Sequence, residues 1–151
     1  KPGFPDHISF NISSDPEAFK YVVESKIPLV MVPSDMGRNK AYLTEEFVEN
    51  MKKTNEVGAF IYQMYSTYWE HGYEDRRIAT NDTCAYIYLT HRDLFICERI
   101  TIDVNTTDAP GKTIVKYDPY GHIELTVGVD RPKFLALMEE KLHDFDGFKL
   151  N

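Results

Sequence analysis

Cysteine is scarce in this sequence, and long apolar segments are missing. Two cysteines, Cys84 and Cys97, occur in 151 residues, which excludes a disulfide framework, and neither has the paired spacing of a metal site. Apolar runs such as residues 84–89 fall far short of the roughly 18 residues that a membrane-spanning helix needs. We expect two buried thiols, which favour a reducing, cytoplasmic setting. Because the first residue is Lys1 rather than Met, we also expect that the start was processed away or that the chain is part of something longer.

Positive charge is also in deficit. The 17 Lys and Arg residues against 24 Asp and Glu residues give a net charge of -7. Affinity for nucleic acid comes mainly from clustered Lys and Arg, so a small neutral ligand or a cation is a better expectation than a polyanion. The five histidines have no His-x-x-x-His spacing, and there is no Gly-rich phosphate loop or Gly-x-Ser-x-Gly motif. Triad-type nucleophilic catalysis therefore finds no support.

The composition has enough apolar material for one folded domain. Hydrophobic residues make up 42% and charged residues 27%, and we expect a single domain over residues 1–151. Apolar and alternating stretches predict strands at residues 27–32, 100–104, 113–117 and 123–129. Capping patterns predict helices that begin at Asp15, Thr44, Asn55, either Thr80 or Asn81, and Asp130, the last ending at Gly147. This order predicts an α/β fold with a mixed, mostly parallel sheet flanked by helices.

The predicted strand at residues 27–32 would need more neighbouring strands than this chain supplies. It is apolar throughout, which is typical of a parallel strand with neighbours on both sides. Before the first helix, residues 4–11 are the only segment that could form a further strand. A half-built sheet would leave backbone groups unpaired along an edge. The pattern therefore favours the second half of a larger α/β domain.

Two polar segments stand where ligands bind in α/β proteins. Residues 9–12 end a predicted strand before the first helix, and ligands of open α/β sheets lie beyond the carboxyl ends of the strands. Asn11 can therefore bind a ligand as donor and acceptor, or serve only as a turn residue. Asp82 opens a helix, either as a first-turn acid or as a ligand for a hard cation. One aspartate cannot complete a calcium site alone.

An aromatic-rich stretch runs from Tyr62 to Tyr73. Several of its members belong to the apolar stripe of a helix, so core packing is one interpretation for each of them. Tyr68, His71 and Tyr73, with Trp69, fall near the helix end, where they could line a pocket that stacks on a planar ring.

Several motifs follow one another in an order that is specific as a set. The chain has Phe10-Asn11-Ile12 before Asp15-Pro16-Glu17-Ala18, then the apolar residues 27–33, then Asn81-Asp82-Thr83-Cys84-Ala85, residues 111–115 and Val129-Asp130. Together they resemble the inosine–uridine-preferring nucleoside hydrolases over roughly residues 8–145. The resemblance implies the C-terminal portion of such a protein, with a Rossmann-like fold.

The resemblance implies calcium-dependent hydrolysis of the N-glycosidic bond of ribonucleosides to ribose and free base, in purine or pyrimidine salvage. In that family a calcium ion held by aspartates binds the ribose diol and the attacking water, and an aspartate acts as the base. By resemblance, Asp82 is a calcium ligand, while Ser9, Asn11 and Asn81 occupy substrate-binding positions. The implied partners are a ribonucleoside, the N-terminal half of the same protein and, as in many members, further copies in a homo-oligomer.

Three departures from the family pattern bear on activity. The Asp-rich N-terminal motif, which supplies most calcium ligands and the catalytic base, is absent from this chain. Ser9 stands where the family usually has a Glu, and Asn81 where it often has a His that protonates the leaving base. A neutral Asn cannot act as a general acid, so Tyr68, His71 and Tyr73 are the candidate donors.

Three hypotheses follow from these residues. The first is nucleoside hydrolysis that requires the missing N-terminal half, with this chain inactive by itself. The second is a non-catalytic relative with a binding or scaffold role, favoured if the Asp-rich motif of the other half is degraded. The third is an unrelated α/β binding domain, which the absence of calcium binding would distinguish from the other two.

Overall fold

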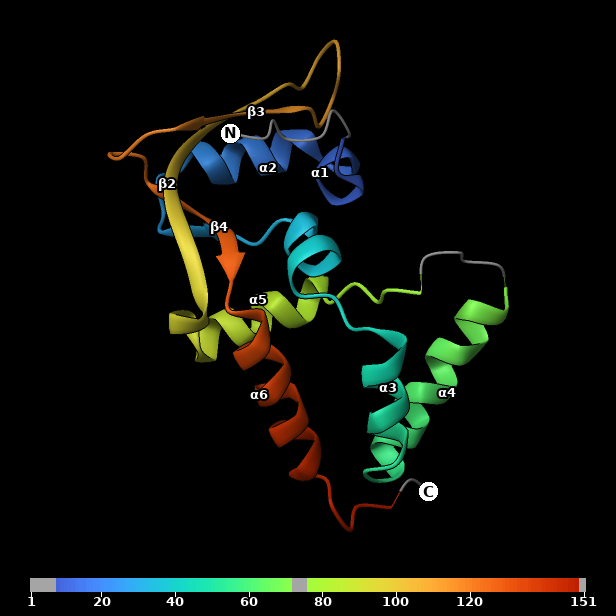
Figure 1. Ribbon diagram of the computed structural model, residues 1–151. Helices are drawn as coiled ribbons and strands as arrows, with labels where there is room; N and C mark the ends of the chain where they lie inside the picture. Colours follow the sequence, from blue (N-terminus) through green and yellow to red (C-terminus); the bar gives the residue numbers. More distant parts are fainter. Residues whose placement is uncertain (1–7, 72–75, 150–151) are drawn as a thin grey trace. The chain divides into compact units, whose positions relative to one another are not determined.

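The computed structural model describes residues 8–71 and 76–149. The chain divides into two compact units, which comprise residues 1–31 with 97–125 and residues 32–96 with 126–151. We call them unit 1 and unit 2 and describe each by itself. Figure 1 labels their helices and strands.

The structure contains a four-stranded sheet, as the predicted α/β class requires. Its strands are β1 (Leu29–Met31), β2 (Phe95–Val104), β3 (Thr113–Tyr117) and β4 (Ile123–Val129), in the order β1-β4-β2-β3. β1 pairs with β4 in parallel, with Leu29 opposite Ile123. β2 pairs with β3 in antiparallel fashion, with Ile100 opposite Tyr117. The prediction of a mixed sheet with flanking helices is therefore confirmed.

The strand predicted at residues 27–32 is shorter and less buried than expected. β1 covers Leu29–Met31, and the side chains of Ile27 and Val30 are 50% and 39% exposed. The reason is the position of β1 at one end of the strand order, where β4 is its neighbour on one side. Full burial of a parallel strand requires cover on both sides, so the prediction of a fully buried strand is wrong for this chain.

Residues 9–12, predicted as the end of a strand, form instead the start of a short helix, α1 (Phe10–Ser14), with Ser9 just before it. The backbone N–H of Ser13 donates to the carbonyl of Ser9 at 2.9 Å. The hydroxyls of Ser13 and Ser14 both donate to the carbonyl of Phe10 at 2.9 Å. Serine side chains that satisfy nearby carbonyls favour such a local turn over a ladder, which explains why the strand prediction is wrong.

The next helix, α2 (Pro16–Glu24), begins as its capping pattern predicts. The carboxylate of Asp15 accepts a hydrogen bond from the backbone N–H of Ala18 at 2.9 Å, and Pro16 occupies the first helical position. The ring nitrogen Nε2 of His122 lies 2.7 Å from the carbonyl of Val23. This contact joins the end of α2 to the start of β4 within unit 1.

Unit 2 contains most of the helices, which are η1 (Met36–Lys40), α3 (Glu45–Lys52), α4 (Glu56–Glu70), α5 (Asn81–Thr90), η2 (Arg92–Leu94) and α6 (Arg131–His143). Three predicted caps are confirmed, because the side chains of Thr44, Asn55 and Asp130 each accept a backbone N–H from the first turn of the following helix. The short helices η1 and η2 are additions that no capping pattern predicted.

The predicted end of the last helix at Gly147 is wrong. α6 ends at His143, and the chain continues through tight turns in which Phe145 N donates to Leu142 O at 3.1 Å and Asp146 N to His143 O at 3.0 Å. These bonds span three residues, so they close turns rather than extend an α-helix. Gly147, with a φ of 82°, adopts the left-handed conformation at the end of those turns.

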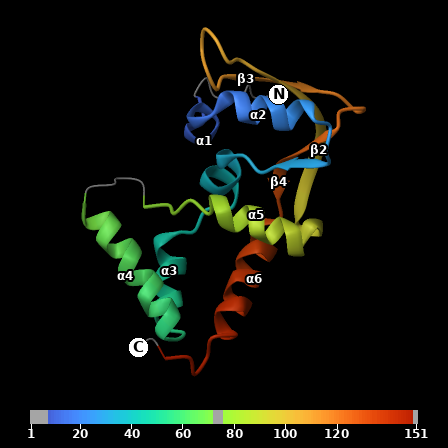
Figure 2. The ribbon, with the colours of Figure 1, turned by 180° about the vertical axis from the view of Figure 1, so that it is seen from behind.

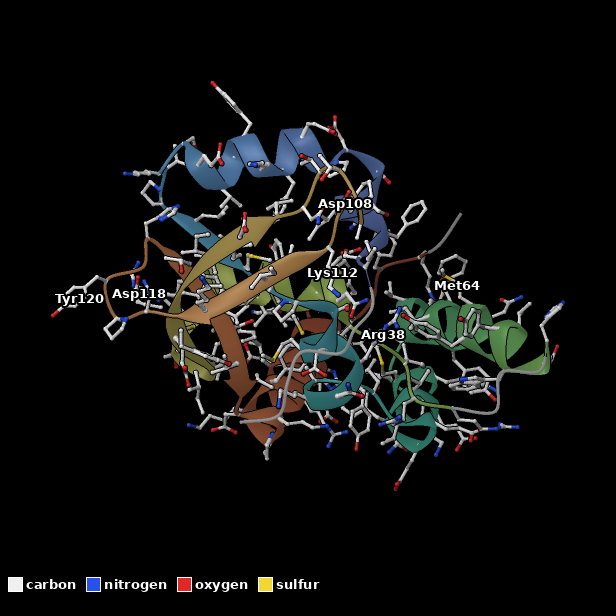
Figure 3. All side chains as sticks on the ribbon, turned by 90° about the horizontal axis from the view of Figure 1, so that it is seen from above. Arg38, Met64, Asp108, Lys112, Asp118 and Tyr120 are labelled. Carbon is white, nitrogen blue, oxygen red and sulfur yellow. The ribbon has the colours of Figure 1, made fainter. Side chains whose placement is uncertain are left out.

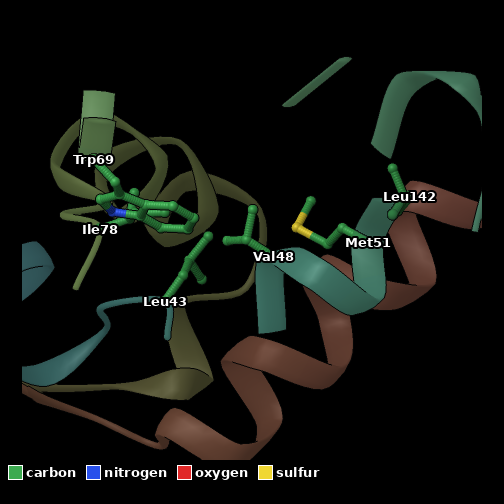
Figure 4. Packing of buried hydrophobic residues seen from close by; sticks show 6 residues of the cluster. All are labelled: Leu43, Val48, Met51, Trp69, Ile78 and Leu142. Atoms are coloured by element: carbon green, nitrogen blue, oxygen red, sulfur yellow. The ribbon is translucent and has the colours of Figure 1, made fainter. Parts of the chain in front are cut away.

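A cluster of six buried residues forms the core of unit 2 (Figure 4): Leu43, Val48, Met51, Trp69, Ile78 and Leu142. α3 and α4 lie side by side as a hairpin in both Figure 1 and Figure 2, and they contribute Val48, Met51 and Trp69. Leu43 and Ile78 exchange backbone hydrogen bonds of 3.0 and 2.9 Å beside them. Leu142 brings the end of α6 to the same cluster, so one core connects the hairpin to the last helix.

None of the helices in the part of the chain that the structure describes has the length and apolar character needed to cross a membrane.

We expect Asn55→Ala to lower the free energy of unfolding by about 1–2 kcal/mol, because it removes a helix cap and a cross-helix contact together. Besides accepting from Gly58 N, Asn55 donates through Nδ2 to Leu142 O at 2.7 Å and to Asp146 Oδ1 at 2.9 Å. Urea unfolding measures the change. Asn50→Ala on the exposed face of α3 is the matched control, and an equal loss in both variants would contradict the assignment.

The pH dependence of stability provides a second test. The pKa of His143 is raised above 6.5, chiefly by its hydrogen bond to Asp146, whose Oδ2 lies 3.0 Å from Nδ1. A raised pKa in the folded state stabilises the protein below 6.5 and loses this effect as the pH rises through the folded pKa. His143→Gln should therefore destabilise the protein at about pH 5.5 and have little effect at about pH 9. The same substitution in an Asp146→Asn background should show no such difference.

Candidate functional site

The first turn of α5 presents the two polar residues that the sequence singled out. Asn81 is the first residue of α5 and is half-buried, while Asp82 follows it and is exposed. An acidic side chain in the first turn interacts favourably with the positive end of the helix. Thr80 precedes the helix but does not cap it with its side chain, since its hydroxyl donates instead to the carbonyl of Ala41 at 2.9 Å.

The short helix η1 packs directly on this turn. The backbone N–H of Thr80 donates to the carbonyl of Gly37 at 3.3 Å. A Cβ atom at Gly37 would lie 2.5 Å from Asn81 N and 2.8 Å from Asn81 Cα, and it would also overlap Asn81 Oδ1. Only glycine therefore permits this approach of η1 to α5. The contact with η1 therefore restricts the position of Asn81.

The carboxamide of Asn81 is unusual in its bonding. Its Oδ1 atom is buried and has no hydrogen-bond partner within residues 8–71 and 76–149. Buried polar atoms in native proteins are nearly always paired, so an unpaired one at the start of a helix is a candidate functional feature.

Cys84, one turn further on, is fully buried, and burial raises the pKa of its thiol. The prediction of two buried thiols is therefore confirmed for Cys84, whereas Cys97 in β2 is only half-buried.

A cavity of about 650 Å³ opens next to this contact between η1 and α5. It is lined by Arg38 and Asn39 of η1, by Met64, Tyr65 and Tyr68 of α4, and by residues 77–79, which lead into Thr80. Figure 3 shows Arg38 and Met64, which enter the lining from these two helices. We call this cavity the arginine–tyrosine pocket. Its volume is that of a site for a small organic molecule.

The pocket lining combines flat aromatic rings with guanidinium groups. Burial raises the pKa of the Tyr65 hydroxyl above its ordinary value of 10.0, so this phenol is protonated at neutral pH. The guanidinium of Arg77 lies 5.1 Å from the centre of the Tyr42 ring. Tyrosine rings and guanidinium planes both offer faces on which a planar heterocycle can stack.

The aromatic candidates lie in different environments in the structure. Tyr68 lines the arginine–tyrosine pocket. Trp69 instead belongs to the core and is 7% exposed. His71 is exposed at the end of α4, with its Nδ1 2.6 Å from the carbonyl of Thr67, and it is not part of the pocket lining. Tyr73 lies outside the described residues.

The two candidates from the start of the chain lie in unit 1. Ser9 precedes α1 and makes no capping bond with its side chain, and Asn11 lies in the first turn of that helix. Both are exposed. The prediction that Asn11 ends a strand is wrong, but its amide is accessible to a ligand.

The acidic residues of the described chain do not form a metal site among themselves. Within residues 8–71 and 76–149, no group of three or more His, Cys, Asp or Glu side chains could hold a metal ion. Calcium needs six to eight oxygen ligands. The exposed carboxylate of Asp82 suits one position in such a set, and the other ligands must come from other residues.

The pocket residues Arg38, Asn39 and Arg77 were not predicted. The segment that carries Arg38 follows the carboxyl end of β1, which is where ligands of open α/β sheets bind. That rule was applied to residues 9–12 and could equally have been applied after Pro33. No signal in the sequence indicated that Arg77 would line the same cavity.

An α/β domain with a small-molecule pocket beside a helix start is the class that the fold and this site define. The chain belongs to the inosine–uridine preferring nucleoside hydrolase family, whose model matches residues 7–136. It is 31% identical over 114 residues to the non-specific ribonucleoside hydrolase RihC of Salmonella schwarzengrund (strain CVM19633), covering 74% of this chain and 37% of that protein. It is 32% identical over 111 residues to RihC of Escherichia coli K12, covering 72% and 36%.

Solved structures show the same fold. A purine-preferring ribonucleoside hydrolase from Gardnerella vaginalis matches with a TM-score of 0.77 at 22% identity, over 94% of this chain and 48% of that one. The plant nucleoside hydrolase PpNRh1 matches with a TM-score of 0.73 at 21% identity, over 88% and 46%. The chain thus spans about half the length of these structures, and just over a third of each RihC protein is matched.

The contact between Gly37 and Asn81 can be tested by adding a single methyl group. We expect Gly37→Ala to lower the free energy of unfolding by about 1–3 kcal/mol, because backbone atoms of α5 must move to admit the Cβ. Gly128→Ala is the control, since the three atoms nearest to its Cβ would be side-chain atoms of Ile96, at 3.2–3.6 Å, rather than backbone atoms. Urea unfolding of both variants gives the comparison. An equally small change in both would show that η1 can move away from α5 at no cost.

Proposed function

We propose that this chain supplies one part of the active site of a calcium-dependent ribonucleoside hydrolase, which releases ribose and a free base. The observation that carries the proposal is the family match over residues 7–136, which includes Asn81-Asp82 at the start of α5 beside a pocket for a planar ligand. In this proposal Asp82 is a calcium ligand, Ser9 and Asn11 contact the ribose, and Tyr68 contacts the base.

The remaining part of the site comes, in this proposal, from a second segment, the N-terminal half of the same protein. Two features support it. A single candidate ligand cannot hold calcium. In addition, β1 lies at the end of the strand order with exposed apolar side chains, where a further strand would give β1 a neighbour on both sides. When bound, calcium would orient the attacking water and lower its pKa.

This chain's own residues have simpler tasks in the proposed reaction. Asp82 provides negative charge and oxygen atoms at an exposed helix start, and the amide of Asn11 can donate to one hydroxyl and accept from another. Tyr68 offers a ring face and a phenol at the pocket. Asn81 cannot release a proton, so it is a binding residue and not a general acid.

The test is ribose release from inosine and uridine by the whole polypeptide as its source makes it, with calcium and after chelation. We expect activity that calcium restores. Asp82→Ala should lower kcat by at least about 100-fold and weaken calcium binding, as loss of a metal ligand does. Asp93→Ala, which removes another exposed first-turn aspartate, is the matched control.

The isolated 151-residue chain gives the complementary arm of this test, and we expect no ribose release from it. Activity in the isolated chain would contradict the need for a second segment. A whole polypeptide that binds nucleosides but releases no ribose would instead identify a non-catalytic relative. A failure to bind calcium would overturn both assignments.

A further inference from the structure

Thr80 connects the start of α5 to η1 through two hydrogen bonds. Its backbone N–H donates to the carbonyl of Gly37 at 3.3 Å, and its hydroxyl donates to the carbonyl of Ala41 at 2.9 Å. Gly37 is near the start of η1 and Ala41 directly follows its last residue, so Thr80 holds both ends of that helix. Thr80 is 5% exposed and Ala41 is fully buried. Water therefore has little access to replace the bond between the hydroxyl and the carbonyl.

The hydroxyl of Thr80 stands where a helix cap is usual, but it does not act as one. The side chain of a threonine that precedes a helix commonly accepts a backbone N–H from the first turn. The side chain of Thr80 makes no such bond to α5, although the Thr80 carbonyl accepts the first helical bond from Cys84 N at 2.8 Å. The hydroxyl oxygen lies 3.3 Å from Cys84 Sγ instead. The hydroxyl therefore serves the contact between α5 and η1 rather than α5 alone.

The helix η1 needs such contacts to keep its position. It is a single π-helical turn, in which Ala41 N donates to Met36 O at 2.8 Å. A helix of one turn is not stable by itself in water, and π-helical turns are rare and occur frequently at functional sites. The bonds from Thr80 and the close approach at Gly37 therefore contribute to holding η1 against α5.

The proposed calcium ligand Asp82 lies two residues after Thr80, in the first turn of α5. Asp82 is exposed, so the backbone of this turn sets its position, and burial of its own side chain does not. Groups that orient a metal ligand affect metal affinity nearly as strongly as the ligands themselves, because a displaced ligand binds the ion less well. Whatever fixes the first turn of α5 therefore acts on the affinity for the ion.

We propose that Thr80 is a positioning residue for Asp82, because its hydroxyl, bound to Ala41 O, fixes the first turn of α5 against η1. This inference rests on the proposed function. Thr80 touches neither the ion nor the substrate, so it is not a catalytic residue. Loss of the hydroxyl leaves the buried carbonyl of Ala41 without this donor and lets the first turn of α5 move, and the carboxylate of Asp82 moves with it.

Three substitutions isolate the role of the hydroxyl. Thr80→Val removes the hydroxyl and nearly keeps the shape of the side chain, whereas Thr80→Ser keeps the hydroxyl and loses a methyl group. Asn55→Ala is the matched control, because it removes hydrogen bonds that cap α4 and join it to the end of α6, away from the first turn of α5. It therefore destabilises unit 2 without disturbing the contact between η1 and α5.

The first measurement is the calcium affinity of the whole polypeptide, by calorimetric titration without nucleoside and at a temperature at which every variant is folded. We expect Thr80→Val to raise the Kd for calcium by roughly 10- to 100-fold. Thr80→Ser should stay within about 3-fold of the parent protein, because it restores the bond to Ala41. Asn55→Ala should leave the Kd unchanged. A purely structural role of Thr80 would lower stability, as Asn55→Ala does, without this change in affinity.

The calcium dependence of ribose release from inosine gives a second readout. In Thr80→Val, excess calcium should restore most of kcat, because the ligand is displaced but still present. In Asp82→Ala, excess calcium should not restore kcat, because the ligand is gone.

Amide hydrogen exchange of the metal-free whole polypeptide tests the position of the turn without any ion. Cys84 N makes the first helical bond of α5, and His91 N donates to Ile87 O at 2.7 Å at the other end of the same helix. We expect Thr80→Val to accelerate exchange at Cys84 at least about 10-fold relative to His91. Asn55→Ala should leave this ratio unchanged.

The outcomes separate the inference from the proposed function. A parent protein that binds calcium, with an unchanged Kd in Thr80→Val, would overturn the positioning role and leave the proposed function standing. Equal losses in Thr80→Val and Thr80→Ser would also overturn it, because the hydroxyl would not be the cause. If Thr80→Val does not fold, Gly37→Ala disturbs the same contact from η1, and an unchanged Kd there would overturn the inference. A parent protein that binds no calcium would overturn both.

Discussion

The close approach of η1 to the first turn of α5 is the constraint on which the site depends. It requires a glycine at position 37, because any Cβ there would overlap backbone atoms of Asn81. Two hydrogen bonds of Thr80, to the carbonyls of Gly37 and Ala41, fix the same contact. As a result, η1, which contributes Arg38 and Asn39 to the pocket lining, is held against the first turn of α5, which carries Asp82. A shift of η1 would therefore move Arg38 and loosen the contact with Asn81 together.

Helix starts could be predicted from the sequence because they depend on neighbouring residues. Strand pairing and strand burial could not, because they depend on distant segments. Asp15, Thr44, Asn55 and Asp130 cap helices because each cap uses residues three positions away. Residues 9–12 were predicted as the end of a strand because a strand was expected before the first helix, but strand formation needs a partner, and serine hydroxyls there favoured a helix. β1 was predicted to be more buried than it is, since burial depends on neighbours that lie outside the segment.

Candidate site residues could be named from the sequence only where a position along one helix or a family motif suggests a role. Asp82 was singled out because a helix start has a known polarity, Tyr68 because it lies in an aromatic-rich helix end, and Asn81 through the family resemblance; their roles stay predictions. Arg38 and Arg77 were missed because they are far apart in the sequence and line one cavity only through the packing of η1, α4 and residues 77–79. Trp69 shows the converse, since its neighbour Tyr68 lines the pocket while it lies in the core.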